Sequence, residues 1–469
     1  MGTTGLIMKF LSSAKLDKIA LDLYERLPLA FRHRFIYGSP FLYWKAFLQE
    51  SQGWDKKRIQ EYQIERLKDL LRHAKNSIPY YKKLFADYGF DPERVQTIDD
   101  IRVLPYLNKE TVRDRLEEFI ISSVPRKSLL MKPTSGSSGI PLTVYKTKES
   151  QKIFTAFWDD LLVRIECMPM SKIMMFWSVI ELGKQKDLPF LRYGNRLIFS
   201  NKHLTDDYMA ECLRLIGKFE PEFIFGFPNT LTVFSAFIKK NGYRPFRNLK
   251  AVIAHSETLY PWQRNLLKEV FGVRIFTIYV MTEFVVFAGE CENSENIHMY
   301  PQYGLAEFKD FDSGHEEIVA TGFTNYAMPL IRYQTGDIVI KGGELCHTCG
   351  RHHQLIDRIE GRINDFLINK EGRVIPRIMP AVKIFPHTKQ YQFLQEEPGK
   401  AGLRIVRADS YSEADTLYIK SKLSEIFGPM SKTIDIEIAF VDSIPQTPAG
   451  KLNLVDQRLD IRKFLAIRS

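Results

Sequence analysis

Long apolar runs are missing from this chain of 469 residues. No stretch reaches the ~18 uninterrupted apolar residues of a membrane-spanning helix, so we expect no membrane span. The N-terminus lacks the apolar core of a secretory signal, and Leu6 stands where a myristoylation pattern needs Ser or Thr. These absences favour a cytoplasmic protein.

Runs of charge of one sign are also missing, although the net charge is +10. No five like charges are consecutive, and no RRM, KH or helix-turn-helix signature is present, so we expect no nucleic-acid partner. A dispersed positive charge favours anionic ligands such as nucleotides and also suits an ordinary solvated surface. The chain is too long for one ordinary domain and predicts two to four.

Cysteine is scarce, and its odd count of five argues against a disulfide framework in a cytosolic chain. Cys346 and Cys349 form a C-x-x-C pair, and Cys291 and His298 lie on a preceding segment. Three thiolates and one imidazole suit a tetrahedral structural Zn²⁺ that is not catalytic. The alternatives are free thiols, or ligation by His347, His352 or His353. We expect the metal to pin the loop after Glu283 to the loop before Arg358.

The order of helical and strand-like segments predicts an α/β fold. Residues 14–125 form a helical start, and from about 129 to 340 strand-like runs alternate with helical ones, which is typical of α/β layers with mostly parallel sheets. Beyond residue 360 the pattern changes to short strands and helices. We therefore predict a large multi-layered N-terminal domain over 1–360 and a small α+β domain over 361–469.

A loop of small residues occupies positions 134–139. It comprises Thr134, Ser135, Gly136, Ser137, Ser138 and Gly139, between two strand-like segments. The glycines allow a backbone with positive φ that turns successive N–H groups to one side, and the hydroxyls add donors with little bulk. The loop suits a polyphosphate, although it is no Walker A loop and could be a surface hairpin.

Four further motifs follow the loop in order. They are YVMTEF (279–284), RYQTGD (332–337), RIEGRINDFLI (358–368) and IPQTPAGK, which ends at Lys451. Their order and gaps resemble the adenylate-forming acyl–CoA ligase superfamily, in its phenylacetate–CoA ligase and CapK-like branch, which includes coenzyme F390 synthetases. The HAKNSIPYYKKLF and LPYLNKE segments are similar to the N-terminal pattern of that branch.

The resemblance implies a two-step reaction. A carboxylate attacks the α-phosphate of ATP to give an acyl-adenylate, and a thiol, amine or hydroxyl then displaces AMP. The expected cofactors are ATP and Mg²⁺, with CoA as the favoured acceptor and a mobile C-terminal lid. Transfer to an amine or sugar, or adenylyl transfer, in surface polysaccharide assembly stays open. So does a non-catalytic nucleotide-binding scaffold.

The resemblance also implies roles for single residues. The 134–139 loop would hold pyrophosphate, Thr282 the α-phosphate, and Glu283 a Mg²⁺ ion, which prefers oxygen ligands. Asp337 would accept from the ribose hydroxyls, and Arg362 would reach ribose or phosphate. Ser256 and Glu257 would line the adenine, and Tyr279 is expected among the nucleotide-binding residues. Lys451 would bridge the attacking carboxylate and the α-phosphate.

Two features leave the prediction less determined. Where the family pattern has an interdomain Asp pivot, this chain has Asn364 followed by Asp365, so either could be the pivot. The bulky segments Met174–Trp177 and Phe225–Phe227 could border a carboxylate substrate or belong to the core. The expected partners are small molecules, and both a monomer and a homodimer remain open.

Overall fold

The structure is a computed structural model. It describes residues 37–134, 142–177, 188–201, 204–244, 246–312, 314–362, 367–372, 374–375, 385–427, 433–445 and 454–460.

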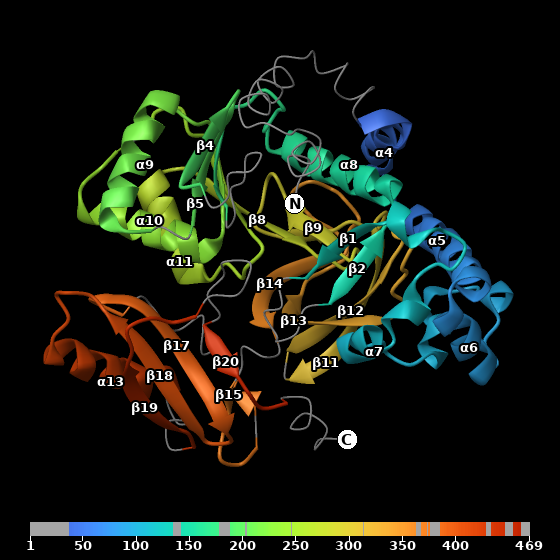
Figure 1. Ribbon diagram of the computed structural model, residues 1–469. Coiled ribbons are helices and arrows are strands. Elements are labelled where there is room, and N and C mark those ends of the chain that lie inside the picture. The colour runs from blue at the N-terminus through green and yellow to red at the C-terminus, as the bar shows by residue number, and fades with distance from the viewer. Residues whose placement is uncertain are drawn as a thin grey trace.

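Helices form the N-terminal part of the described chain (Figure 1, blue to cyan). They are α4 (Gly38–Ser51), α5 (Lys56–Ser77), α6 (Pro79–Asp87) and α7 (Lys109–Asp114), with 3₁₀ turns η3 (Pro92–Arg94), η4 (Ile98–Val103), η5 (Leu116–Phe119) and η6 (Arg126–Ser128). Asp55 accepts from the N–H of Arg58 at 2.8 Å and caps α5. Pro79 begins α6, where its missing N–H costs nothing.

A mixed sheet of twelve strands forms the centre of the described residues. Its order is β11-β12-β13-β14-β10-β9-β8-β7-β6-β3-β5-β4. The strands are β3 (Ile173–Trp177), β4 (Phe190–Tyr193), β5 (Arg196–Ser200), β6 (Phe223–Gly226), β7 (Ala251–His255), β8 (Arg274–Val280), β9 (Phe287–Glu290), β10 (Ile297–Met299), β11 (Gly304–Asp312), β12 (His315–Gly322), β13 (Tyr333–Lys341) and β14 (Leu355–Arg362). Parallel pairing is confined to β5, β3, β6, β7 and β8, and the other neighbours are antiparallel.

Helices cover both faces of the parallel strands. α9 (Asp206–Phe219), α10 (Pro228–Lys240) and α11 (Pro261–Phe271) lie together on one face (Figure 1, green). They share an apolar cluster with Ile224, Val252 and Ile275 of the strands. α8 (Lys148–Arg164) and α4 share a cluster with the alternate strand residues, such as Phe223 and Phe276. Alternate residues of one strand therefore serve two cores, as expected for a strand buried on both faces.

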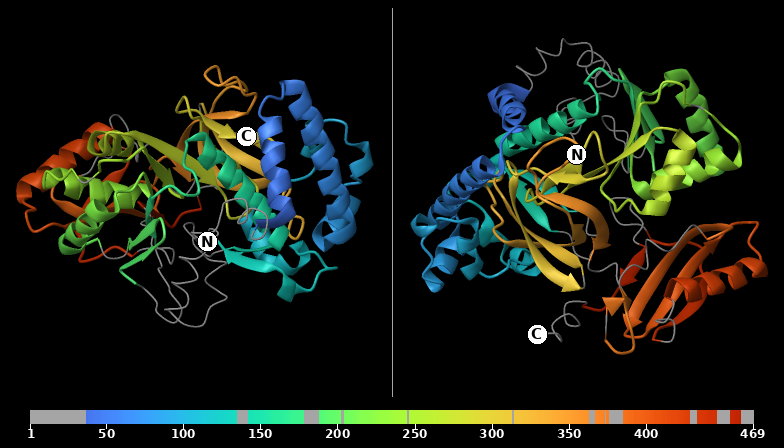
Figure 2. Two further views of the ribbon diagram at one scale, coloured as in Figure 1. Left: turned by 90° about the horizontal axis from the view of Figure 1, so that it is seen from above. Right: turned by 180° about the vertical axis from the view of Figure 1, so that it is seen from behind.

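A smaller α+β unit follows (Figures 1 and 2, orange to red). A four-stranded sheet has the order β19-β18-β17-β20, with helix α13 (Glu413–Phe427) between β18 and β19 in the chain. The strands are β17 (Thr388–Glu397), β18 (Lys400–Arg407), β19 (Asp435–Phe440) and β20 (Val455–Gln457), and β15 (Leu367–Ile368) pairs with β16 (Val374–Ile375) before them. The predicted α/β class with a small α+β unit is confirmed. Among the described residues, no helix is long and apolar enough to cross a membrane.

Candidate active site

A cavity of about 670 Å³ opens where the parallel strands end. β3, β6, β7 and β8 are neighbours that run in one direction, so their carboxyl ends meet at this edge, which is where open α/β sheets bind ligands. The cavity brings together eight of the predicted nucleotide-site residues: Thr134, Ser256, Glu257, Tyr279, Thr282, Glu283, Asp337 and Arg362.

Asp337 is the centre of a hydrogen-bonded group in this cavity. It lies on β13 directly opposite Arg362 of β14, and its Oδ1 is 3.3 Å from the Arg362 Nε. The Tyr279 hydroxyl donates to Asp337 Oδ2 at 2.6 Å. Burial, with the charge of Asp337, raises the pKa of Tyr279 well above its ordinary value, so this hydroxyl stays a donor. The carboxylate is therefore held in one orientation before any ligand arrives.

Glu283 occupies a tight turn beside this group. The Phe284 N–H donates to the Met281 carbonyl at 3.2 Å, and Phe284 has a φ of +62°, which is strained for a residue with a side chain. Glu283 is buried, and burial raises the pKa of its carboxyl although Arg362 and Lys109 oppose the shift. A divalent cation bound at Glu283 would stabilise the ionised form of this buried carboxyl.

Ser256 and Glu257 form the turn after β7. Ser256 has a φ of +67° and is exposed to the cavity, while Glu257 accepts from the N–H of Asn229 at 3.1 Å. Strained residues with side chains tend to gather at functional sites. Of the six among the described residues, Ser256 is a predicted site residue, and Phe284 and Arg332 lie in the predicted motifs 279–284 and 332–337.

The described residues include the two strands that flank the predicted 134–139 loop and Thr134, the first residue of that loop. β1 (Leu130–Pro133) and β2 (Thr143–Lys146) pair antiparallel, as the flanking sequence predicts. Thr134 N–H donates to the Leu142 carbonyl at 2.8 Å, and Thr134 Oγ1 accepts from the Leu142 N–H at 2.9 Å. The remaining predicted loop residues lie outside the described residues, as do three other predicted ones: Ser135, Gly136, Ser137, Ser138, Gly139, Asn364, Asp365 and Lys451.

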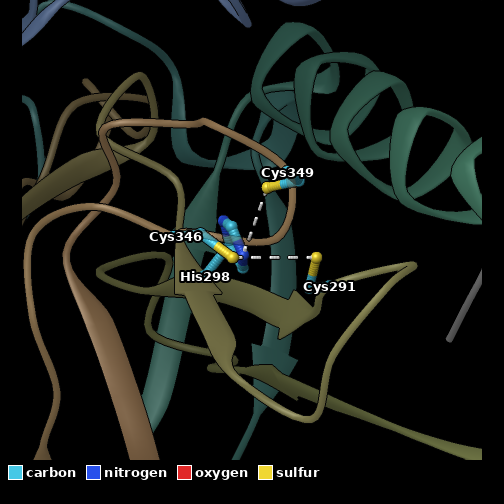
Figure 3. Close-up of side chains that lie close together, drawn as sticks. All are labelled: Cys291, His298, Cys346 and Cys349. Atoms are coloured by element: carbon cyan, nitrogen blue, oxygen red, sulfur yellow. Dashed lines mark hydrogen bonds between the residues drawn. The ribbon is translucent and has the colours of Figure 1, made fainter.

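Cys291, His298, Cys346 and Cys349 converge in a second site, as predicted (Figure 3). Their potential ligand atoms all lie within 4.8 Å of one another. Cys346 Sγ is 3.9 Å from Cys291 Sγ, and Cys349 Sγ is 3.9 Å from His298 Nε2. A tetrahedral zinc ion with bonds of about 2.3 Å would hold its ligand atoms roughly 3.8 Å apart. The four residues therefore suit a structural zinc ion, and His347, His352 and His353 are not among them.

The surroundings of this Cys–His cluster also suit a metal. Burial, aided by Arg164 and Arg351, lowers the pKa of His298 to about 4, which keeps the imidazole in its neutral, metal-binding form. The Asn293 N–H points to Cys291 Sγ at 3.4 Å, and Thr348 Oγ1 lies 3.0 Å from Cys346 Sγ. Hydrogen bonds of this kind orient metal ligands.

Arginines hold the loop that carries Cys291. Arg274 donates to the Cys291 carbonyl at 2.6 Å, and Arg351 binds Glu292 through two contacts of 2.6 and 2.9 Å. Arg264 of α11 pairs with Glu290, whose side chain is buried, and both residues line the cavity of about 670 Å³. Glu290, the chain neighbour of Cys291, therefore lines the cavity and links it to the Cys–His cluster.

The chain is similar to known proteins in its C-terminal unit and over most of its length. Residues 367–458 match a domain family described as the CapK C-terminal domain. A phenylacetate-coenzyme A ligase of Thermus thermophilus is 27% identical over 88% of this chain and 99% of its own. Protein CapK of Staphylococcus aureus is 23% identical over 92% of this chain and 97% of its own.

This chain is a relative of the phenylacetate–CoA ligases and of CapK. Its fold agrees with that of a solved 2-hydroxyisobutyryl-CoA ligase in complex with an adenylate, with a TM-score of 0.68, 16% identity and coverage of 89% of this chain and 93% of that one. The predicted family resemblance and the predicted class of enzyme, an adenylate-forming ligase, are both confirmed.

Lys109 is a site residue that the sequence reasoning missed. It is the first residue of α7, whose cap Asn108 accepts from the Thr111 N–H at 2.8 Å, and it lines the cavity. Burial lowers the pKa of Lys109, while Glu283 opposes that shift and Arg362 adds to it. The LPYLNKE segment contains this lysine, but only the pairing of Leu107 with β13 brings it to Glu283.

Proposed function

We propose that this protein activates a carboxylate with ATP and Mg²⁺ through an acyl-adenylate and then transfers the acyl group to CoA. One observation carries the proposal. Segments from residues 109, 134, 256, 279–283, 337 and 362 supply a carboxylate pair, four hydroxyls and two cations to a single cavity. Such a set neutralises and orients a nucleoside triphosphate.

Each group has a role in the proposed reaction. Asp337, oriented by Tyr279 and Arg362, accepts from the ribose hydroxyls. Thr134 and the loop after it bind pyrophosphate, and Ser256 with Glu257 borders the adenine. Thr282 binds the α-phosphate, and Glu283 holds Mg²⁺, which withdraws charge from the phosphates when bound. Lys109 adds a cation beside Glu283.

Lys451 supplies the last cation in this proposal. The C-terminal unit over 361–469 acts as a lid that turns at Asn364 or Asp365 and brings Lys451 between the carboxylate and the α-phosphate. We expect Lys451→Ala to abolish adenylation and to spare the second half-reaction from a supplied acyl-adenylate. Normal pyrophosphate exchange by this variant would contradict the role.

The Cys–His cluster has a structural role in the proposal. Zn²⁺ bound by Cys291, His298, Cys346 and Cys349 has no position left for substrate, so it holds two loops together and takes no part in the chemistry. Metal analysis of the purified protein tests this. Less than about a tenth of an equivalent of zinc per chain would count against the site, because closed thiolate sites retain their metal tightly.

The acceptor has one specific alternative. The CapK-like side of the resemblance, which includes the match of residues 367–458 to the CapK C-terminal domain, implies transfer of the acyl group to an amine or a sugar instead of CoA, in surface polysaccharide biosynthesis. Analysis of the products with and without CoA separates the two, because only the CoA ligase needs the thiol to release AMP.

A screen for pyrophosphate exchange across many carboxylates tests the main proposal. Exchange that depends on one acid supports the ligase. ATP binding without exchange for any acid would instead favour a nucleotide-binding scaffold. Localisation in the cytoplasm and the oligomeric state, monomer or homodimer, stay predictions.

A further inference from the structure

The two strands that flank the predicted 134–139 loop carry two lysines on one face. In the antiparallel pair of β1 and β2, Lys132 lies opposite Val144, and Leu130 lies opposite Lys146. Residues that lie opposite each other share a face of a sheet, and so do residues two apart along a strand. Lys132 and Lys146 are therefore diagonal neighbours on the less exposed face of both strands.

Lys146 is the buried member of this pair, with an exposed fraction of only 4%. Its Nζ donates to Gln151 Oε1 at 2.6 Å and lies 4.4 Å from the centre of the Phe284 ring. Both contacts are with uncharged groups. Burial, with the charge of Lys132, lowers the pKa of Lys146 to about 7, whereas a nearby carboxylate would raise it. The base of the loop is therefore short of negative charge.

Lys132 lines the cavity of about 670 Å³, and it differs there from the other cationic side chains. Lys109 has the charge of Glu283 close by. The other cations of the lining form ion pairs, which are Arg264 with Glu290, Lys268 with Glu295, Arg358 with Glu360 and Arg362 with Asp337. Lys132 has no acidic partner in the part of the chain that the structure describes, so its charge is left for a ligand.

The position of Lys132 next to the loop indicates which ligand group it meets. Lys132 stands two residues before Thr134, a separation of about 7 Å along a strand. The two hydrogen bonds between Thr134 and Leu142 close the hairpin at this point and fix the start of the loop. In the proposed function the loop binds pyrophosphate. A lysine ammonium has three N–H donors and commonly binds phosphate oxygens.

We propose that Lys132 binds the β- and γ-phosphates of ATP, which leave together as pyrophosphate. Its ammonium adds a full positive charge to the N–H groups and hydroxyls of the loop. Lys146, buried beside it, raises the positive potential there without touching the ligand. This inference rests on the proposed function and adds a phosphate-binding residue to it. AMP and the acyl-adenylate lack both phosphates, so Lys132 distinguishes ATP from either.

Equilibrium binding of ATP and of AMP tests the inference. Calorimetric titration with Mg²⁺ and without any carboxylate gives both Kd values and involves no turnover. Lys132→Met keeps a long side chain and removes the charge. We expect the Kd for ATP to rise about tenfold or more, because a charged hydrogen bond to phosphate is lost, and the Kd for AMP to stay within about twofold. In pyrophosphate exchange, the KM for pyrophosphate should rise and the KM for the carboxylate should not.

Two further variants are the controls. Lys132→Arg keeps the charge and should bind ATP within about threefold of the wild type, because a guanidinium also binds phosphate. Lys127→Met makes the same chemical change at an exposed lysine of η6, outside the cavity lining, and should leave both Kd values unchanged. It measures the effect of a lower net charge alone. An unchanged Kd for AMP in Lys132→Met shows that this variant is folded.

The outcomes separate this inference from the ligase assignment. An unchanged Kd for ATP in Lys132→Met, or an equal loss of affinity for ATP and AMP, would refute the inference and leave the ligase intact. CoA also contains a diphosphate, so a rise in the KM for CoA alone would place Lys132 there and refute the inference as well. Weaker ATP binding by Lys132→Met, in a protein whose wild type exchanges pyrophosphate with no acid, would support the phosphate contact and contradict the ligase.

Discussion

Asp337 offers the sharpest test of the nucleotide site. In the proposed complex its carboxylate accepts from both ribose hydroxyls, and Tyr279 and Arg362 already orient it. A hydrogen bond to a charged group is worth about 1.5–3 kcal/mol, compared with about 0.5–1.5 kcal/mol for a neutral pair. Asp337→Asn keeps the shape and removes the charge, so it should lose about 1 to 1.5 kcal/mol for each hydroxyl. Two hydroxyls predict a rise in the Kd for ATP of roughly 30- to 150-fold.

Removing one hydroxyl from the ligand isolates the contact. The wild type should bind 2′-deoxy-ATP about 10- to 100-fold more weakly than ATP, because it loses one charged hydrogen bond. In Asp337→Asn the same comparison should give a difference of about tenfold or less. Calorimetric titration measures the Kd values of the wild type and of Asp337→Asn for ATP and for 2′-deoxy-ATP. A thermodynamic cycle of these four values gives the coupling energy between Asp337 and the 2′-hydroxyl.

Tyr279→Phe serves as the matched control. It removes the 2.6 Å hydrogen bond to Asp337 and keeps the carboxylate, so the preference for ATP over 2′-deoxy-ATP should persist. Circular dichroism would verify that both variants fold. An undiminished preference for ATP in Asp337→Asn would refute the assignment of Asp337 to the ribose.

Four further predictions follow from single contacts. Lys109→Met should lower kcat/KM for pyrophosphate exchange by at least tenfold, whereas the exposed Lys57→Met should not, and equal activities would remove Lys109 from the site. Gly322→Ala should destabilise the fold by about 1–3 kcal/mol and disturb the Glu283 turn, because the added Cβ would lie 2.1 Å from the Phe284 carbonyl oxygen. Urea unfolding measures this change in stability. Gly53→Ala is the control, because a Cβ added at Gly53 would have no other atom within 4 Å. Burial, with nearby Lys132, lowers the pKa of Lys146 to about 7. Between pH 7 and 10 the unfolded chain therefore binds one more proton than the folded chain, so the free energy of unfolding of the wild type should rise relative to Lys146→Met by about 1 kcal/mol per pH unit. A difference between the two proteins that does not change with pH would contradict this. Cys346→Ser should release zinc and lower the melting temperature, whereas Cys212→Ser should leave the zinc content unchanged.

The sequence predicts more of the local structure than of its assembly. Pro79 separates α5 from α6 and Asn108 caps α7, as their residue types require. The alternation expected between residues 129 and 340 includes strand-like runs at 223–227 and 249–256, and these become β6 and β7. The antiparallel half of the sheet was not predicted, because an alternating or apolar run gives a strand without giving the direction of its neighbour.

In the candidate site, too, the sequence predicts single residues better than the contacts between distant segments. The motifs predict Tyr279, Glu283 and Asp337 individually, and all three line the cavity. Lys109 is absent from that prediction, because a lysine after a helix cap has no distinguishing pattern of its own. Its role depends on Leu107, whose bridge to Tyr333 is a contact between residues more than two hundred positions apart.

β14 connects two features that have been described separately. Its first residue, Leu355, pairs with His298 of the Cys–His cluster, and its last, Arg362, pairs with Asp337. The register of β14 against β13 shifts at two places between these ends, at Ile338/Val339 and at Ile340/Lys341. A slip of one residue would turn the Arg362 guanidinium to the opposite side of the sheet. A metal ion bound by the Cys–His cluster would therefore fix the first residue of β14 and, through the register of that strand, the side on which Arg362 meets Asp337.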